Sequence, residues 1–204
     1  MNLYSRHVFP RVCDCLMGLP GLAEQRRLAL AEAGGDILEI GFGTGRNLSS
    51  YPGHVRRIMA IDPNVGMSKL ALMRIAASGI EVDRRTLGGE ALPLDDESFD
   101  TVVSTFSMCS IPEVGRAIGE VYRVLRPGGR LIFLEHGLSG DPGIRRWQRR
   151  LNPIERIVGD GCRLDLDVEA VIRGQPFAAV DVERSEMKWL PRTHGTFYRG
   201  RATK

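Results

Sequence analysis

Four short apolar runs, separated by segments with helical periodicity, constrain the fold of this chain more than any other feature. The runs are DILEI (36–40), RIMAI (57–61), DTVVST (100–105) and RLIFLE (130–135). Their content of Ile, Val, Leu and Phe is typical of strands in a parallel sheet that is covered on both faces. Helical spacing over 65–77 and 114–125 separates them. The alternation predicts an α/β fold with an open, doubly wound sheet.

Two further runs, AAVDVERS (178–185) and GTFYRGRA (195–202), are expected to add strands near the end of the chain. The segment RPGG (126–129) is expected to end a helix and turn into the next strand. No internal repeat, low-complexity tract or linker divides the 204 residues. We therefore expect a single domain.

The first apolar run leads directly into a glycine loop. Gly41, Gly43 and Gly45 alternate with other residues, so the backbone must turn tightly and a ligand can approach it closely. A doubly wound sheet binds its ligand at the carboxyl ends of the strands, where this loop stands. The spacing G-x-G-x-G differs from the G-x-G-x-x-G of dinucleotide-binding folds.

Two acidic residues define what the loop would bind. Glu39 stands two residues before Gly41, where a carboxylate repels a pyrophosphate and suits an ammonium or sulfonium group. Asp62 lies 21 residues beyond Gly41 at the end of the second run, where an acid accepts hydrogen bonds from both hydroxyls of a ribose. Together they predict a nucleoside that lacks a phosphate and carries a positive tail, which describes S-adenosylmethionine.

The motifs around these acids resemble those of class I S-adenosylmethionine-dependent methyltransferases of the type 11 branch. The matching stretches are LEIGFGTGRN (38–47), IDPN (61–64), GEALPLDDESFDTVVS (89–104) and EVYRVLRPGGRLIFLEH (120–136). The resemblance implies an enzyme that uses S-adenosylmethionine, with a mostly parallel, seven-stranded, Rossmann-like sheet and helices on both faces. It also implies a division of the domain (1–204) into an N-terminal helical lid or arm (1–35), a cofactor-binding core (36–136) and a substrate-side part (137–204).

The same resemblance implies a set of cofactor-binding residues. Glu39 and the glycine backbone would hold the methionine end, Asp62 the ribose, and Pro63 and Met67 the adenine, although Met67 at helical spacing is equally suited to the core. Gly88 stands where many relatives have an Asp that meets the adenine amino group, so that contact is expected from the backbone around Gly89 and Glu90 or is absent. The full set is Glu39, Gly41, Gly43, Gly45, Asn47, Asp62, Pro63, Met67, Gly89, Glu90 and Thr105.

A narrower resemblance bears on the methyl acceptor. The stretches YSRHVFPRV (4–12), STFSMCSIPE (104–113), LEHG (134–137) and GDGCRLDLDVEAVI (159–172) are similar to small bacterial relatives of the mammalian alkyl thiol methyltransferases. This implies a small, rather apolar acceptor, with a thiol as the first candidate. The segment 104–110 lacks the two prolines typical of enzymes that methylate base amines. The alternatives are a phospholipid or quinone-precursor N-, O- or C-methyltransferase and, from another class, a non-catalytic S-adenosylmethionine-binding protein.

The residues that would assist the chemistry are two histidines. His136 directly follows the strand run 130–135, so it either faces the acceptor or packs under the strand. His7 belongs to an N-terminal segment that is either a lid or a docked arm. Asp160 with Cys162 is a further candidate, although Cys162 equally suits a small buried position, and His194 is expected to be structural. A thiol with a reference pKa of about 8.5 needs only modest help to ionise.

The N-terminal segment from Tyr4 to Met17 precedes the first strand and has helical spacing. Its apolar residues Val8, Val12 and Leu16 share one side, together with Cys15, and this side is expected to dock on the sheet or cover the site. We predict a lid.

Composition limits the partners and the location. The net charge of +3 is too small to indicate a nucleic-acid partner, and the basic cluster of Arg145, Arg146, Arg149 and Arg150 is typical of a solvated helix face. The four cysteines show no paired metal-site spacing, so no metal is predicted and a reducing cytoplasm is expected. No apolar run reaches the length of a membrane span, and no N-terminal anchor is expected. Peripheral membrane contact and the oligomeric state are left open.

Overall fold

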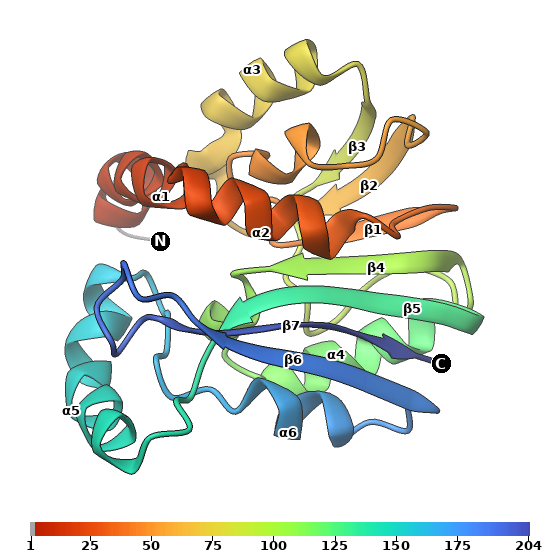
Figure 1. Cartoon of the computed structure of the whole chain (residues 1–204). Coiled ribbons are helices and arrows are strands. Elements are labelled where there is room, and N and C mark those ends of the chain that lie inside the picture. The colour runs from red at the N-terminus through yellow and green to blue at the C-terminus, as the bar shows by residue number, and fades with distance from the viewer. Residues whose placement is uncertain (1–2) are drawn as a thin grey trace.

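A seven-stranded sheet forms the centre of the residues that the structure describes (Figure 1). The structure is a computed structural model, and it describes residues 3–204 except for the side chains at positions 67 and 68. The strand order is β3-β2-β1-β4-β5-β7-β6, with β7 antiparallel to both of its neighbours. The strands are β1 (Ile37–Ile40), β2 (Arg57–Ile61), β3 (Glu81–Arg85), β4 (Phe99–Thr105), β5 (Leu125–His136), β6 (Ala179–Glu186) and β7 (Thr196–Thr203). The predicted fold class is confirmed.

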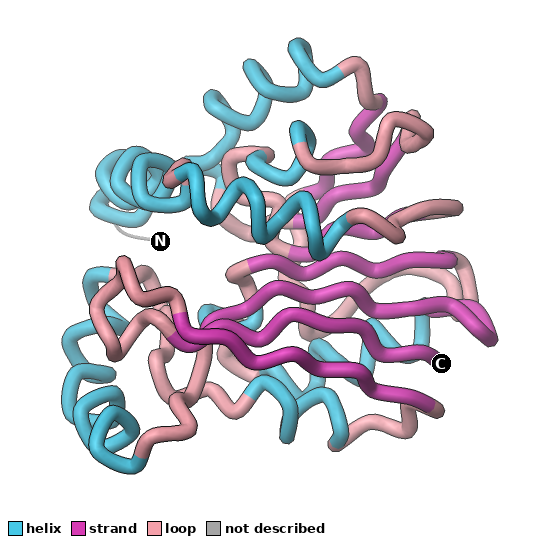
Figure 2. Tube along the Cα trace, in the orientation of Figure 1, coloured by secondary structure: helices cyan, strands magenta, loops and turns pink. Residues whose placement is uncertain are grey.

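Helices cover both faces of the sheet (Figure 2). The α-helices are α1 (Phe9–Met17), α2 (Pro20–Leu30), α3 (Ser68–Ser78), α4 (Val114–Val124), α5 (Pro142–Val158) and α6 (Val168–Arg173). Short turns of other helix types are η1 (Tyr4–Val8), η2 (Arg46–Ser49), η3 (Val65–Met67) and η4 (Met108–Ser110). Helices α2 and α3 pack on one face, and α4 and α6 pack on the other.

The strands are apolar on both sides because each face has its own core. Neighbouring residues Val102 and Val103 of β4 belong to different cores, one under α4 and α6 and the other under α2 and α3. In the same way, Ile132 and Phe133 of β5 point to opposite faces and are at most 2% exposed. Full burial of one such side chain contributes roughly 1.5–3 kcal/mol. The sequences of these strands are therefore continuous apolar stretches and do not alternate between apolar and polar residues.

Two elements differ from the sequence prediction. Strand β3 was not predicted, because its sequence EVDRR lies at the sheet edge, is partly exposed and carries charges. Strand β5 begins already at Leu125, so the segment RPGG belongs to it. Gly128 adopts a left-handed φ of 77°, and its amide donates to the carbonyl of Lys204 over 2.9 Å. The turn-forming residues are thus held to the sheet as an irregular start of the strand.

The N-terminal segment is helical, as predicted. The prediction of which side of this segment docks on the protein is wrong. Val8, Val12 and Leu16 are 49%, 46% and 54% exposed, and Cys15 is also exposed. The opposite side faces the protein, where Ser5 is buried. Met17 at the end of α1 packs against the core, and polar contacts orient the rest of the segment. Between residues 3 and 204, the structure contains no helix that is both long and apolar enough to span a membrane.

Candidate active site

The glycine loop between β1 and η2 lies at the carboxyl edge of the sheet. Gly41 has a φ of 72°, and a Cβ added there would lie 1.9 Å from Ser107 Oγ. Gly45, with a φ of 77°, caps the start of η2. Gly43 has a φ of 55°, and an added Cβ would meet only the Gly41 carbonyl, 3.9 Å away. Gly41 is therefore required by its contact with Ser107, whereas Gly43 faces open space that a ligand can enter.

Asp62 directly follows β2 and lies beside this loop. Its side chain accepts a hydrogen bond from the Gly43 amide over 2.7 Å and one from the Asn64 amide over 2.7 Å, one on each oxygen. Burial raises the pKa of Asp62 above its usual range, against the effect of these two bonds. An ionised carboxylate has about four acceptor positions, so capacity remains for a diol. Pro63 is exposed next to it, and the side chain of Met67 lies outside the described residues.

Glu39 lies beneath the loop and is 1% exposed. One oxygen accepts from Asn47 Nδ2 over 3.0 Å and the other from the Tyr51 hydroxyl over 2.7 Å. Asn47 also donates to Thr105 Oγ1 over 3.0 Å, which links the loop to β4. Burial raises the pKa of Glu39 to about 7. Three residues predicted from the resemblance thus form one buried network that supports the loop.

The loop after β3 reaches the same region. Gly89 is buried, and a Cβ added there would lie 3.5 Å from Ile40 Cγ2 at the end of β1. Glu90 is half-buried. The predicted cofactor positions therefore gather around the ends of β1 and β2.

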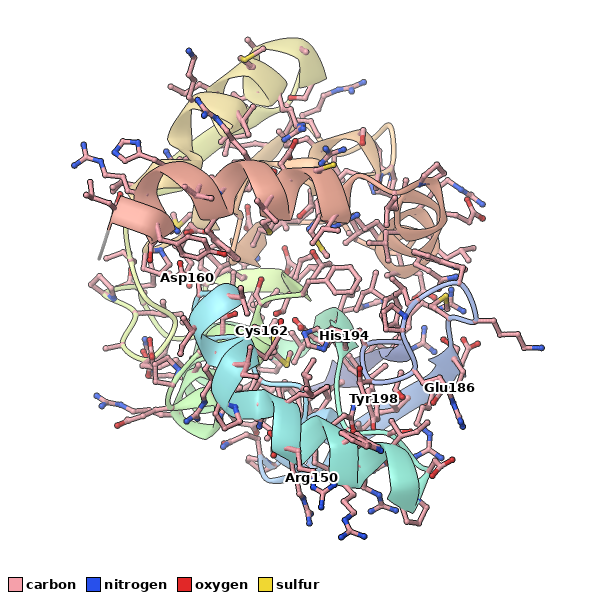
Figure 3. All side chains as sticks on the ribbon, turned by 90° about the vertical axis from the view of Figure 1, so that its left-hand side faces the viewer. Arg150, Asp160, Cys162, Glu186, His194 and Tyr198 are labelled. Carbon is pink, nitrogen blue, oxygen red and sulfur yellow. The ribbon has the colours of Figure 1, made fainter. Side chains whose placement is uncertain are left out.

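A second group of residues gathers at the ends of β4 and β5. His136 is the last residue of β5, Cys109 lies in η4 after β4, and Cys162 lies in the turn after α5, where Figure 3 labels it. His136 Nε2 is 3.1 Å from Cys162 Sγ, and the two sulfur atoms are 3.4 Å apart. The sequence pattern pointed to His136 and Cys162 separately and did not mark Cys109, because the two cysteines are 53 positions apart in the chain.

The charges in this cluster are coupled. The hydrogen bond from Cys162 lowers the pKa of the Cys109 thiol well below its usual range. Burial disfavours the charged imidazole, but the charge and hydrogen bond of Cys109 together with the charges of Glu135 and Glu155 raise the pKa of His136 to about 9. An imidazolium and a thiolate therefore stabilise each other at neutral pH.

Glu135 fixes the position of this cluster. Its carboxylate is fully buried and accepts from Ser104 Oγ over 2.8 Å, from the Ser107 amide over 3.0 Å and from the Met108 amide over 3.2 Å. Burial raises the pKa of Glu135 to about 8. Glu135 was not among the predicted site residues, although an acid inside the apolar run RLIFLEH is a signal for a functional or structural role.

The N-terminal segment contacts the glycine loop through Asp14 of α1. The carboxylate accepts from Thr44 Oγ1 over 2.6 Å, from Arg46 Nε over 2.9 Å and from Arg74 Nη1 over 2.7 Å. Although burial opposes it, these bonds hold the pKa of Asp14 far below its usual range. One acid on the segment therefore joins α1 to the loop and to α3.

A second set of contacts joins η1 to the far side of the site. Ser5 Oγ donates to Asp160 Oδ1 over 2.6 Å, and the Ser5 carbonyl accepts from Asn64 Nδ2 over 3.2 Å. In Figure 3, Asp160 lies directly beneath the N-terminal helices. The segment thus spans from the loop after β2 to the turn that carries Cys162. His7 is exposed on η1, and the structure brings His136, not His7, to the cysteine cluster.

Comparisons with known proteins show the family of this chain. Residues 38–133 match a family described as a methyltransferase domain. Thiol S-methyltransferase TMT1B of Rattus norvegicus is 35% identical over 175 residues, which cover 82% of this chain and 70% of that protein. The chain belongs to the class I S-adenosylmethionine-dependent methyltransferases.

Other relatives of this methyltransferase differ in acceptor. Phosphatidylethanolamine N-methyltransferase of Cereibacter sphaeroides is 35% identical over 152 residues, covering 72% of this chain and 74% of that one. A methyltransferase of Thermotoga maritima, described as a possible histamine N-methyltransferase, superposes with a TM-score of 0.67 at 24% identity, over 98% of both chains, and shows the fold alone. The protein is therefore an enzyme whose cofactor is S-adenosylmethionine, and the alternative of a non-catalytic binding protein is set aside.

Proposed function

We propose that this methyltransferase methylates a small, rather apolar thiol. The observation that carries the proposal is the cluster of His136, Cys109 and Cys162 at the ends of β4 and β5, next to the glycine loop. An imidazolium beside this cluster can stabilise another thiol, whose reference pKa is about 8.5, in its thiolate form. An aliphatic hydroxyl would need a stronger base, and Glu135 is already bound by three donors. The thiol S-methyltransferase relatives support the same acceptor.

The cofactor residues have distinct roles in this proposal. Asp62 holds the ribose with its remaining acceptor positions, and the backbone from Gly41 to Gly45 receives the methionine end. Glu39 supplies negative charge beneath that end without touching solvent. Pro63, Met67 and the backbone at Gly89 and Glu90 border the adenine, while Asn47 and Thr105 position the loop. When bound, S-adenosylmethionine supplies an electrophilic methyl group.

The remaining task of the protein is to hold the acceptor in line with that methyl group. Correct orientation of two reactants contributes up to about 7–11 kcal/mol in well-arranged cases. We assign His136 to the acceptor sulfur, where its imidazolium stabilises the thiolate form of the acceptor. His7 is exposed on η1, so it has a part only if the segment moves.

The division of the chain follows the same lines. Residues 36–136 would bind the cofactor, residues 137–204 would complete the acceptor side, and residues 1–35 would act as a lid. The contacts of Asp14 and Ser5 support the lid, since they cross the space between the two halves. Location in the cytoplasm stays a prediction.

A lipid amine is the second candidate acceptor, because a phosphatidylethanolamine N-methyltransferase is 35% identical to this chain. The test is a panel of small thiols, phenols and phosphatidylethanolamine vesicles, with formation of S-adenosylhomocysteine measured by mass spectrometry. We expect the wild type to methylate thiols, and we expect an Asp62→Ala variant to lose this activity. If only a phenol or the lipid amine is methylated, the thiol proposal is wrong and the methyltransferase assignment stands.

A further inference from the structure

Three donor atoms that suit a metal ion converge at the ends of β4 and β5. They are Cys109 Sγ, His136 Nε2 and Cys162 Sγ, and all lie within 4.8 Å of one another. Each comes from a different element: η4, β5 and the turn after α5. Within residues 3–204, these three residues are the group of His, Cys and acidic side chains that fits a metal ion. Sequence spacing alone excluded a metal site, because the chain lacks a paired cysteine motif.

The distances fit a tetrahedral ion. With Zn–S near ~2.3 Å and Zn–N near ~2.1 Å, tetrahedral angles require about 3.8 Å between two sulfur ligands and about 3.6 Å between sulfur and nitrogen. The sulfur atoms of Cys109 and Cys162 are 3.4 Å apart, and His136 Nε2 is 3.1 Å from Cys162 Sγ. These two pairs of donors need to separate by about half an ångström, and the third pair, Cys109 and His136, lies within 4.8 Å. Thiolate and imidazole donors favour zinc over Mg²⁺ and Ca²⁺.

The backbone holds these donors in place. Arg163, next to Cys162, donates from its amide to the Cys109 carbonyl over 3.1 Å and from Nε to the same carbonyl over 3.2 Å. Arg163 Nη2 also donates to the Ile111 carbonyl over 2.9 Å. Glu135 fixes the other end of η4 through the Met108 amide. The two cysteines are therefore joined by main-chain contacts rather than brought together by flexible surface side chains.

We propose that Cys109, His136 and Cys162 bind one zinc ion and leave its fourth position open on the acceptor side. Structural zinc sites normally have four protein ligands, whereas catalytic sites have three and bind water or substrate in the fourth position. Zinc binding displaces the protons of both cysteines, so a metal-bound cluster holds thiolates. The Cys₂His set with an open position is one of the catalytic arrangements.

The role of the ion rests on the proposed thiol methylation. An acceptor thiol that occupies the fourth position releases its proton to solvent, because a coordinating thiol is deprotonated outright. Its sulfur then forms a bond to the methyl carbon as the bond from that carbon to the cofactor sulfur breaks. The products are S-adenosylhomocysteine and a neutral thioether, which binds zinc weakly and leaves.

The test measures the metal on the full-length protein, purified without chelator under reducing conditions. We expect about one zinc per chain by inductively coupled plasma mass spectrometry, and thiolate-to-cobalt absorption bands after replacement of zinc by Co²⁺. Cys162→Ser and His136→Gln should each weaken zinc binding about 100-fold or more. Cys15→Ser is the matched control, since Cys15 is exposed on α1 and should leave the metal content unchanged.

Circular dichroism and calorimetry with S-adenosylmethionine show whether each variant is folded. The conclusion rests on Cys162→Ser and His136→Gln, so a Cys109→Ser variant is not needed. The proposal is wrong if the reduced wild type binds no zinc, or if Cys162→Ser and His136→Gln both retain it. A disulfide between Cys109 and Cys162, seen as a mass two hydrogens lower, would also overturn it. If the protein binds zinc but does not methylate thiols, the proposal of a thiol acceptor is wrong and the proposal of a zinc site stands. Undiminished thiol turnover by metal-free protein refutes the site and keeps the acceptor.

Discussion

Replacement of Asp14 by Asn tests whether the N-terminal segment is a lid. The Asp14 side chain is only 15% exposed and accepts hydrogen bonds from two guanidinium groups, those of Arg46 and Arg74. Asn has the same shape but no charge, so the two arginines would face each other without a counter-charge. The apolar side of the segment is exposed, and its other polar contacts, those of Ser5 and Tyr4, lie at the far end in η1.

The size of the effect follows from the burial of the three groups. Removing one partner of a fully buried ion pair costs about 3–5 kcal/mol. Arg46 and Arg74 are 30% and 29% exposed, so water recovers part of this loss. We expect the free energy of opening of the segment to fall by about 2–3 kcal/mol, which raises its opening equilibrium roughly 30- to 140-fold.

Native-state hydrogen exchange measures this opening directly. Amides of residues 4–17 in Asp14→Asn should exchange faster by the same factor, while amides of β4 and β5 keep their wild-type rates. Asp181→Asn is the matched control, because Asp181 forms an ion pair with Arg201 and is 69% exposed. A surface pair of this kind contributes at most about 1 kcal/mol.

Two results would refute the reasoning. Unchanged exchange over residues 4–17 would show that Asp14 does not hold the segment. Equal acceleration throughout the sheet would show that Asp14 supports the whole domain, and the segment would then be an arm of the core. If the lid opens as expected, the KM for the acceptor should rise in the same variant.

The remaining predictions concern the cofactor, the acceptor and pH. Asp62→Ala should weaken S-adenosylmethionine binding about 10- to 100-fold, through loss of about 1–3 kcal/mol, and calorimetry should detect no NAD binding in the wild type. Deletion of residues 1–17 should raise the acceptor KM or abolish turnover while circular dichroism shows a folded protein. His136→Ala should lower turnover about 100-fold or more, while the affinity for the cofactor stays near that of the wild type. If the variant instead loses stability but keeps its rate per folded molecule, the role of His136 is structural. Because the pKa of Asp14 is lowered in the folded state, its contribution to stability is present above about pH 4 and is lost as the pH falls through the folded pKa. Hydrogen exchange over residues 4–17 should therefore show a difference in the free energy of opening between wild type and Asp14→Asn that shrinks from pH 7 to pH 3.

The sequence predicted the elements whose signal is local. The apolar runs of β1, β2, β4 and β5 are buried on both faces, so composition alone marks them. Strand β3 was not predicted because it lies at the sheet edge, where charged residues such as Asp83 and Arg85 are tolerated and no apolar run marks the strand. The glycine loop and Asp62 were also recognisable, since both follow strands directly.

The sequence did not predict features that depend on distant partners. Val12 and Leu16 suggested which side of α1 docks, but the contacts of Asp14 with two arginines determine it. Helical periodicity gives no measure of one strong ionic contact relative to several weak apolar contacts. The cysteine cluster was missed for the same reason. Cys109 and Cys162 meet because β4 and β5 are neighbours and α5 returns its turn to their ends.

Ser107 connects the two halves of the candidate site. Its hydroxyl donates to the Gly41 carbonyl over 3.3 Å, and its amide donates to Glu135 over 3.0 Å. Glu135 precedes His136 in the chain, so Ser107 links the glycine loop to the acceptor cluster. A side chain at Gly41 would overlap Ser107, which would push the two halves apart. Since methyl transfer depends on the separation of nucleophile and methyl carbon, Gly41→Ala should reduce turnover more than it reduces the affinity for S-adenosylmethionine, a pattern opposite to that of Asp62→Ala.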